Sequence, residues 1–184
     1  MPIVEKTLPG AARAFRDRLN SLLAATLTES RLVVFEARGA FCLGFRRRGV
    51  IVEAPLSTQR GRFGLSIGQT FEGVSEPGGI RLTTRSYRYV LTPEGAQEGL
   101  FRWEYEKRWP RPEDRWCRHH LQGTVSVPLP SGSVALDALH VPTGYVTLEE
   151  VLRFCIVDLG AKPRKKGWHE RLEESYRRFR EDEE

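Results

Sequence analysis

The chain has 184 residues, of which 40% are hydrophobic, and a formal net charge of +5. This length and composition suit one domain with an ordinary core rather than two large domains. No run approaches the roughly 18 to 20 apolar residues that a membrane-spanning helix needs, and the N-terminus has no hydrophobic stretch of signal-peptide type. We therefore expect a cytoplasmic protein with no membrane partner.

The basic residues are mostly arginine rather than lysine. A guanidinium group is a planar fork that binds phosphate through two hydrogen bonds, so an arginine-rich basic protein is compatible with a nucleic-acid partner. A GC-rich genome also raises the arginine content without any selection on function. The charge alone therefore leaves both explanations open.

The three cysteines, Cys42, Cys117 and Cys155, are far apart in the sequence and show no C-x-x-C spacing. This argues against a disulfide framework and against a zinc knuckle. His140 and His169 are also isolated, with no second ligand at metal spacing. We expect buried thiols, no metal site, no cofactor and no role for these two histidines.

The N-terminal part of the chain predicts one helix and then short strands. Apolar residues recur at helical spacing over residues 11–27, which indicates an amphipathic helix. Short runs rich in β-formers follow at residues 32–37, 41–46 and 50–54. A meander is the simplest topology for such a series.

The middle of the chain predicts a longer hairpin. Residues 57–79 are rich in glycine and polar residues around one strand at 65–71, so we expect loops there. Residues 80–91 and 100–107 have strong strand patterns and are joined by a turn sequence. A further strand fits residues 116–127.

The C-terminal part predicts two helices. Thr147 and Glu150 form a capping-box pattern ahead of an apolar stripe, and a last helix carries its apolar residues between Trp168 and Phe179. We expect this last helix to dock on its own domain or on a partner. The predicted fold is α+β: an antiparallel meander sheet of about five to seven strands, preceded by one helix and followed by two. Residues 1–160 form the domain, and residues 161–184 form a basic linker with an appended helix.

The usual catalytic signatures are missing: the chain has no P-loop, no G-x-G-x-x-G, no H-E-x-x-H and no G-x-S-x-G. Polar and aromatic residues instead gather between residues 87 and 120, on three strands that a meander brings side by side. These residues are Tyr87, Arg88, Tyr89, Arg102, Glu104, Arg118, His119 and His120.

Strand alternation divides this group between two faces of a sheet. His119 shares a face with apolar residues and is expected in or near the core, whereas His120 is expected on the water-exposed face together with Arg118. Arg102 and Glu104 are expected on the exposed face, opposite the aromatic residues of their strand. In the predicted strand at residues 80–91, strand alternation puts Arg81 on the same face as Tyr87.

These residue types suit RNA cleavage without a metal. The reaction needs a base for the 2′-hydroxyl proton, an acid for the leaving oxygen and cations for the phosphorane. We expect His120 and Glu104 to act as the acid–base pair with Arg102 beside them. The expected nucleic-acid-binding residues are Tyr87, Arg88, Arg118, Arg46, Arg47, Arg48, Lys165 and Lys166. For Arg102 and Glu104, the simpler interpretation is a cross-strand ion pair on the solvated surface of the sheet.

The order of motifs between residues 87 and 159 resembles the TumE family of toxins from toxin–antitoxin systems. The matching motifs are Tyr87-Arg88-Tyr89, Phe101-Arg102-Trp103-Glu104, His119-His120 and the helix that opens at Thr147. The resemblance implies a toxin that is held by a cognate antitoxin and acts on RNA. This chain departs from the family pattern at two positions: Glu104 replaces an aspartate, and Gln122 replaces a further histidine. Glutamine cannot transfer a proton. Gln122 therefore leaves open that this chain is a relative of the family that binds its target without cleaving it.

Two alternatives remain from the sequence. The first is a non-catalytic RNA- or DNA-binding subunit of a defence or ribonucleoprotein complex, which grips the backbone with the same sheet and the arginine-rich loops. The second is a protein-interaction module that uses the stripe of the C-terminal helix.

Overall fold

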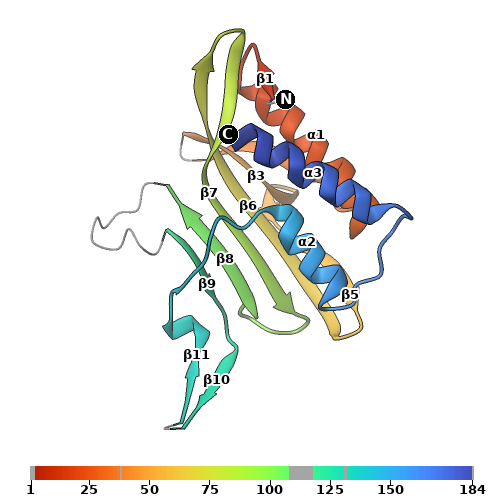
Figure 1. Cartoon of the computed structure of the whole chain (residues 1–184), viewed down its shortest axis with the longest axis vertical. Helices are drawn as coiled ribbons and strands as arrows, with labels where there is room; N and C mark the ends of the chain where they lie inside the picture. The colour runs from red at the N-terminus through yellow and green to blue at the C-terminus, as the bar shows by residue number, and fades with distance from the viewer. Residues whose placement is uncertain (1–2, 38, 108–117, 131, 184) are drawn as a thin grey trace.

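A computed structural model describes residues 3–37, 39–107, 118–130 and 132–183. It confirms the predicted α+β class: one N-terminal helix, a large antiparallel sheet and two C-terminal helices (Figure 1). The helices are α1 (Leu8–Thr26), α2 (Leu148–Val157) and α3 (Trp168–Glu183).

The large sheet is a meander in the order β12-β9-β8-β7-β6-β3-β2. Its main strands are β2 (Leu32–Ala37), β3 (Ala40–Arg47), β6 (Gly61–Glu76), β7 (Gly79–Pro93), β8 (Phe101–Glu106), β9 (His119–Gln122) and β12 (Val141–Pro142). Three short strands join it at the sides: β1 (Val4–Glu5) on β7, β4 (Val50–Ile51) on β3 and β5 (Ala54–Thr58) on β6. The strand predicted at residues 65–71 lies within β6, but the loops predicted around it are wrong, because β6 pairs with β7 along nearly its full length.

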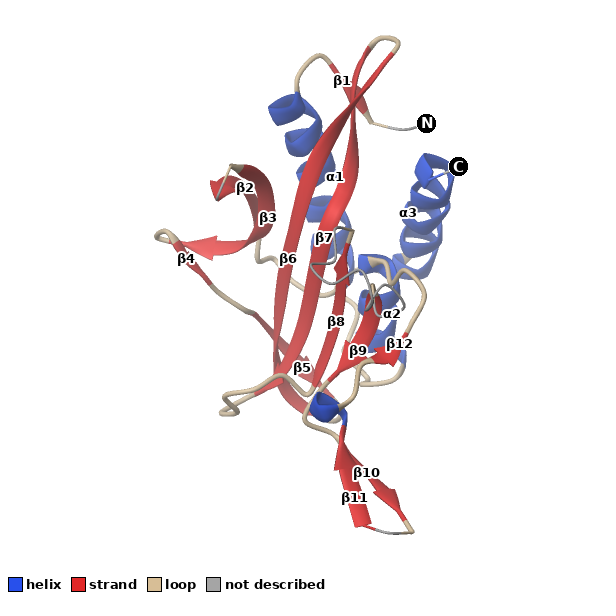
Figure 2. Ribbon diagram, turned by 90° about the vertical axis from the view of Figure 1, so that its left-hand side faces the viewer, coloured by secondary structure: helices blue, strands red, loops and turns tan. Residues whose placement is uncertain are grey.

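A separate hairpin projects from the lower end of the sheet (Figure 2). It consists of β10 (Ser126–Leu129) and β11 (Gly132–Ala135), and a short 3-10 helix, η2 (Leu136–Ala138), follows it. The predicted strand at 116–127 is therefore broken after β9, and its first two residues lie outside the described part of the chain. Gly123 marks the break: a Cβ atom there would lie 2.0 Å from the carbonyl oxygen of Leu100, so only glycine fits where the chain leaves the sheet.

The three α-helices lie together on one face of the sheet (Figure 1), and the core lies between them and the sheet. Tyr89 and Leu65 from the strands, Leu23 from α1 and Cys155 from α2 are at most 2% exposed. Cys155 is buried, as the sequence predicts, and burial raises the pKa of its thiol to about 12. Cys42 is only half-buried and Cys117 lies outside the described residues.

Helix α2 begins where the sequence predicts. The Thr147 hydroxyl accepts a hydrogen bond from the Glu150 amide at 3.2 Å, and the Glu150 carboxylate accepts one from the Thr147 amide at 2.7 Å. This reciprocal capping box confirms the expected pattern.

Helix α3 packs on the protein's own domain, against α1 and α2. Leu172 belongs to the core and is 4% exposed, and the Phe179 ring lies 5.2 Å from that of Tyr145. The apolar stripe thus packs on the chain's own domain, the first of the two places where the sequence predicts that it docks. Among the described residues, no helix combines the length and apolarity needed to cross a bilayer.

A β-bulge interrupts the β6–β7 pairing at Thr70 and Phe71. Thr70 pairs with Ser86 but Phe71 pairs with Thr84, so Arg85 is the extra residue. The alternation of faces therefore changes phase along β7. Leu82 packs on the core, and Arg81 lies on the face away from the helices, not on the face of Tyr87 as the sequence predicts.

Candidate functional site

The face of the sheet away from the helices is hollowed into a trough of about 1020 Å³. Residues of β3, β6, β7, β8 and β9 line it, together with Asp137 and His140 from the segment that leads to β12. The three residues that the sequence predicts as catalytic, His120, Glu104 and Arg102, all line this trough.

Strand alternation brings these residues to one face, as predicted. In the paired register, Arg88 lies opposite Glu104 and Glu104 lies opposite His120. Arg102 lies opposite Gln122 in the next row. On the other face, the His119 ring stacks on that of Tyr105, with 4.3 Å between centroids and an interplanar angle of 8°. Two consecutive histidines thus face opposite environments.

Glu104 is the centre of the polar cluster. Its Oε1 atom lies 3.0 Å from Arg88 Nε, and its Oε2 atom lies 2.9 Å from Arg102 Nε and 3.4 Å from His120 Nε2. Burial raises the pKa of this carboxyl, but the hydrogen bond with His120 and the charges of Arg102 and Arg88 outweigh that effect and lower it below its usual value. Glu104 is therefore a carboxylate at neutral pH, and its place between two guanidiniums makes it an anchor rather than a proton donor.

His120 is far less accessible than the sequence predicts. It lies on the polar face, yet its side chain is only 3% exposed. Pro142 of β12 pairs with it, and the His140 ring lies against it at 5.0 Å between centroids. The prediction of a water-exposed His120 is wrong, because the segment after η2 folds back over the end of β9.

His140, for which the sequence predicts no role, also lines the trough. It is exposed at the trough, and its Nε2 atom lies 3.2 Å from Gln122 Nε2. Gln122 accepts a hydrogen bond from Arg102 through its Oε1 atom, so its amide nitrogen is the donor toward His140. Nε2 of His140 is then the accepting nitrogen, and the neutral ring carries its proton on Nδ1. No local motif marks His140, because it follows Gln122 by eighteen residues.

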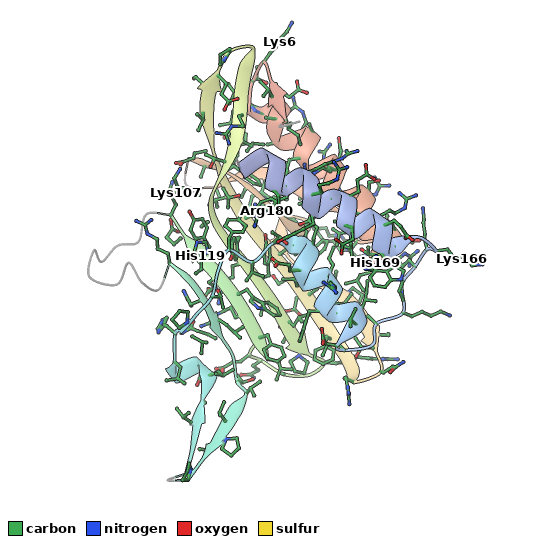
Figure 3. All side chains as sticks on the ribbon, in the orientation of Figure 1. Lys6, Lys107, His119, Lys166, His169 and Arg180 are labelled. Carbon is green, nitrogen blue, oxygen red and sulfur yellow. The ribbon has the colours of Figure 1, made fainter. Side chains whose placement is uncertain are left out.

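The other predicted nucleic-acid-binding residues separate into different places. The Tyr87 side chain is buried on the helix-covered face, 2% exposed, where its hydroxyl accepts a hydrogen bond from the Val146 amide at 2.9 Å, so the ring points away from the trough. Burial also raises the pKa of that hydroxyl. Arg118 is exposed directly before β9. Lys165 and Lys166 lie on the linker before α3, and Figure 3 shows Lys166 at the right-hand edge of the view, far from His119.

The arginine triplet lies at the tip of the β3–β4 hairpin. The guanidinium of Arg46 lies 4.7 Å above the Phe35 ring, and its Nε atom donates a hydrogen bond to the Gly49 carbonyl at 2.7 Å. Phe35 lines the trough, so Arg46 stands at its end farthest from His140. Arg47 and Arg48 are exposed beside it.

The charges of the trough are mixed. Four carboxylates line it in addition to Glu104: Glu53, Glu98, Glu106 and Asp137. The positive charge among the lining residues is concentrated at Arg88 and Arg102, and the Arg88 side chain is 58% exposed. This distribution favours contact with one phosphate group at the two arginines over contact with a long stretch of polyanion.

Comparison with family models, with curated proteins and with solved structures gives no significant match to this chain. Within the described ranges, no group of three or more His, Cys, Asp or Glu side chains is placed to hold a metal ion.

Proposed function

We propose that the trough binds one phosphodiester of RNA and cleaves it without a metal, as a toxin-like ribonuclease. The observation that supports this most is the convergence of two guanidiniums and the His120 imidazole on Glu104, with the His140 imidazole against His120 and open to the trough. Arg88 and Arg102 provide the positive charge that a phosphorane requires.

The proton-transferring group in this proposal is His140 rather than His120, because His120 is 3% exposed. The Gln122 amide turns away from Nε2 of His140, the one basic nitrogen of the neutral ring. Nε2 then takes the proton of the 2′-hydroxyl, and the 2′-oxygen forms a bond to phosphorus. The bond from phosphorus to the 5′-oxygen then breaks, and the same proton is returned to that leaving oxygen. The products are a 2′,3′-cyclic phosphate and a 5′-hydroxyl, and no proton is gained or lost overall.

Glu104, His120 and Gln122 act as positioning residues in this scheme. Glu104 holds both arginines and the His120 ring, and Gln122 holds His140 in one tautomer. Gln122 stands where the TumE pattern has a histidine, and His140 brings an imidazole to the same part of the trough from another element. This supports a catalytic rather than a purely binding relative, with a cognate antitoxin as the proposed partner.

The test is cleavage of single-stranded RNA by the purified protein in the presence of a chelator. His140→Ala should lower the rate by about 100-fold or more, the usual contribution of a general acid–base group. His169→Ala is the matched control, because His169 is exposed on α3 and lies outside the trough. Intact RNA with the wild type, or full activity of His140→Ala, would contradict the proposal.

A second candidate is a non-catalytic nucleic-acid-binding subunit. The observation that favours it is the exposed triplet Arg46 to Arg48 at one end of the trough. In that case binding weakens steeply with salt while the RNA stays intact, and Arg47→Ala with Arg48→Ala reduces the salt dependence. The cleavage assay separates this candidate from the first.

A further inference from the structure

Gly68 leaves a bare floor in the middle of the trough, with a second glycine, the buried Gly44, directly beside it. Gly44 of β3 pairs directly with Gly68 of β6, and Gly68 pairs with Arg88 of β7. Both glycines line up with Glu104 in one row across the sheet. Neighbouring strands lie about 4.8 Å apart, so the floor at Gly68 is about 10 Å from Glu104.

The fold explains only one of these glycines. A Cβ atom at Gly44 would lie 2.7 Å from the Ile67 carbonyl oxygen, so the close approach of two strands requires glycine there. At Gly68 the nearest atom to such a Cβ would be the Arg88 carbonyl oxygen at 3.8 Å, and the backbone φ is not positive. Glycine inside a strand weakens it, and where packing does not demand it, it often marks the close approach of a ligand.

The side chains around this floor suit a flat, polar ring. The Phe35 ring borders Gly44, with its nearest edge 3.8 Å from where a Cβ would be, and the Arg46 guanidinium covers the ring. The hydroxyl groups of Thr70 and Ser86, 2.5 Å apart, lie in the adjacent row. A guanidinium plane, like an aromatic ring, stacks on unpaired bases in single-strand recognition, and hydroxyl groups can hydrogen-bond to the edge of such a base.

From this geometry we infer that the trough floor at Gly68 binds one unpaired nucleobase of RNA, next to the phosphate held at Arg88 and Arg102. The inference rests on the proposed function and adds the substrate class: single-stranded RNA with a base turned into the trough. A base within a duplex is stacked on both faces and paired along its edge, so it cannot lie on this floor.

The experiment uses binding, so that it is independent of cleavage. A short fluorescent 2′-O-methyl oligoribonucleotide has no free 2′-hydroxyl and cannot be cut. Gly68→Val fills the floor with a side chain that has room and suits a strand, so its melting temperature should equal or exceed that of the wild type. Its affinity for the single strand should fall at least tenfold, and Gly68→Ala should give a smaller loss of about threefold.

Ser57→Val is the matched control. It adds the same side chain to an exposed position of β5 outside the trough lining, and binding should not change. The wild type should also prefer the single strand to a duplex of the same sequence. Unchanged binding by folded Gly68→Val, or equal affinity for duplex and single strand, overturns the inference even if RNA is cleaved. Weakened binding by Gly68→Val without any cleavage by the wild type supports the base site and refutes the ribonuclease proposal.

Discussion

The two faces of the sheet use the same strands for opposite purposes. On the helix-covered face, Tyr87 and Tyr89 stack at 4.7 Å between ring centroids and are both 2% exposed. On the other face, Arg88 and Glu104 form an ion pair at the trough. The covered face holds the fold through apolar contacts, whereas the open face keeps charges that stabilise one another and remain within reach of a ligand. Residues one position apart should therefore differ sharply in what their removal does.

The largest expected contrast is between Tyr89 and Arg88. Tyr89→Ala removes a fully packed ring from the core and should lower the free energy of unfolding by about 3 to 5 kcal/mol. Arg88→Ala removes a 58% exposed side chain and should cost less than about 1 kcal/mol. Urea denaturation of both variants measures the difference. Similar losses for the two would contradict the division of the sheet into a structural and a functional face.

An effect of intermediate size is expected for the Glu104 carboxylate at the centre of the polar cluster. Glu104→Gln should lower the free energy of unfolding at pH 7 by about 2 kcal/mol, because a 23% exposed carboxylate with charged partners is lost. The pKa of Glu104 is lowered in the folded state, so its contribution is complete above the ordinary value of 4.5 and is lost as the pH falls through the folded pKa. The variant and the wild type should therefore converge in strong acid. Urea midpoints at pH 7 and in acid, for the range where both remain folded, provide the test.

The smallest effect concerns His119, the first residue of β9. Burial, and then the charges of Arg118 and His120, lower the pKa of His119, whose Nδ1 atom is buried without a hydrogen-bond partner. Its neutral form is favoured in the fold, so stability is lost as the pH falls from about 6.5, the ordinary value, through the folded pKa. His119→Phe keeps the stacking on Tyr105 and should differ from the wild type by less than about 1.5 kcal/mol at pH 8.

The pH dependence is the decisive part of this last comparison. His119→Phe should lose less stability than the wild type between pH 8 and pH 5, as measured by thermal unfolding. His169→Ala, on exposed α3, is the control and should follow the wild type. An identical pH dependence for His119→Phe and the wild type would show that the stacked ring is not held neutral.

Local patterns predicted what depends on neighbours in sequence. Alternation along β8 and β9 separated Glu104 from Tyr105 and His120 from His119, because each strand is regular there. The capping box likewise depends only on the four consecutive residues from Thr147 to Glu150. Where the chain departs from regular pairing, the same rule fails: the bulge at Arg85 shifts Arg81 to the other face.

Features that depend on distant segments were not predictable from the sequence. His140 reaches Gln122 only because the chain after β9 makes a hairpin and returns as β12. The same return covers His120, so its accessibility depends on a segment with no recognisable pattern. The glycine floor also needs the register between β3 and β6, which brings Gly44 opposite Gly68.

The packing of α3 on α1 has a consequence for how the protein is made. The amides of Arg164 and Lys165, on the way to α3, donate hydrogen bonds to the carbonyls of Thr26 and Ala25 at the end of α1, at 2.9 and 3.1 Å. Because α3 follows every strand in the chain, the first helix and the strands leave the ribosome before the segment that covers them. The core thus stays partly open during synthesis, and folding is completed by a contact between distant parts of the chain, which is intrinsically slow.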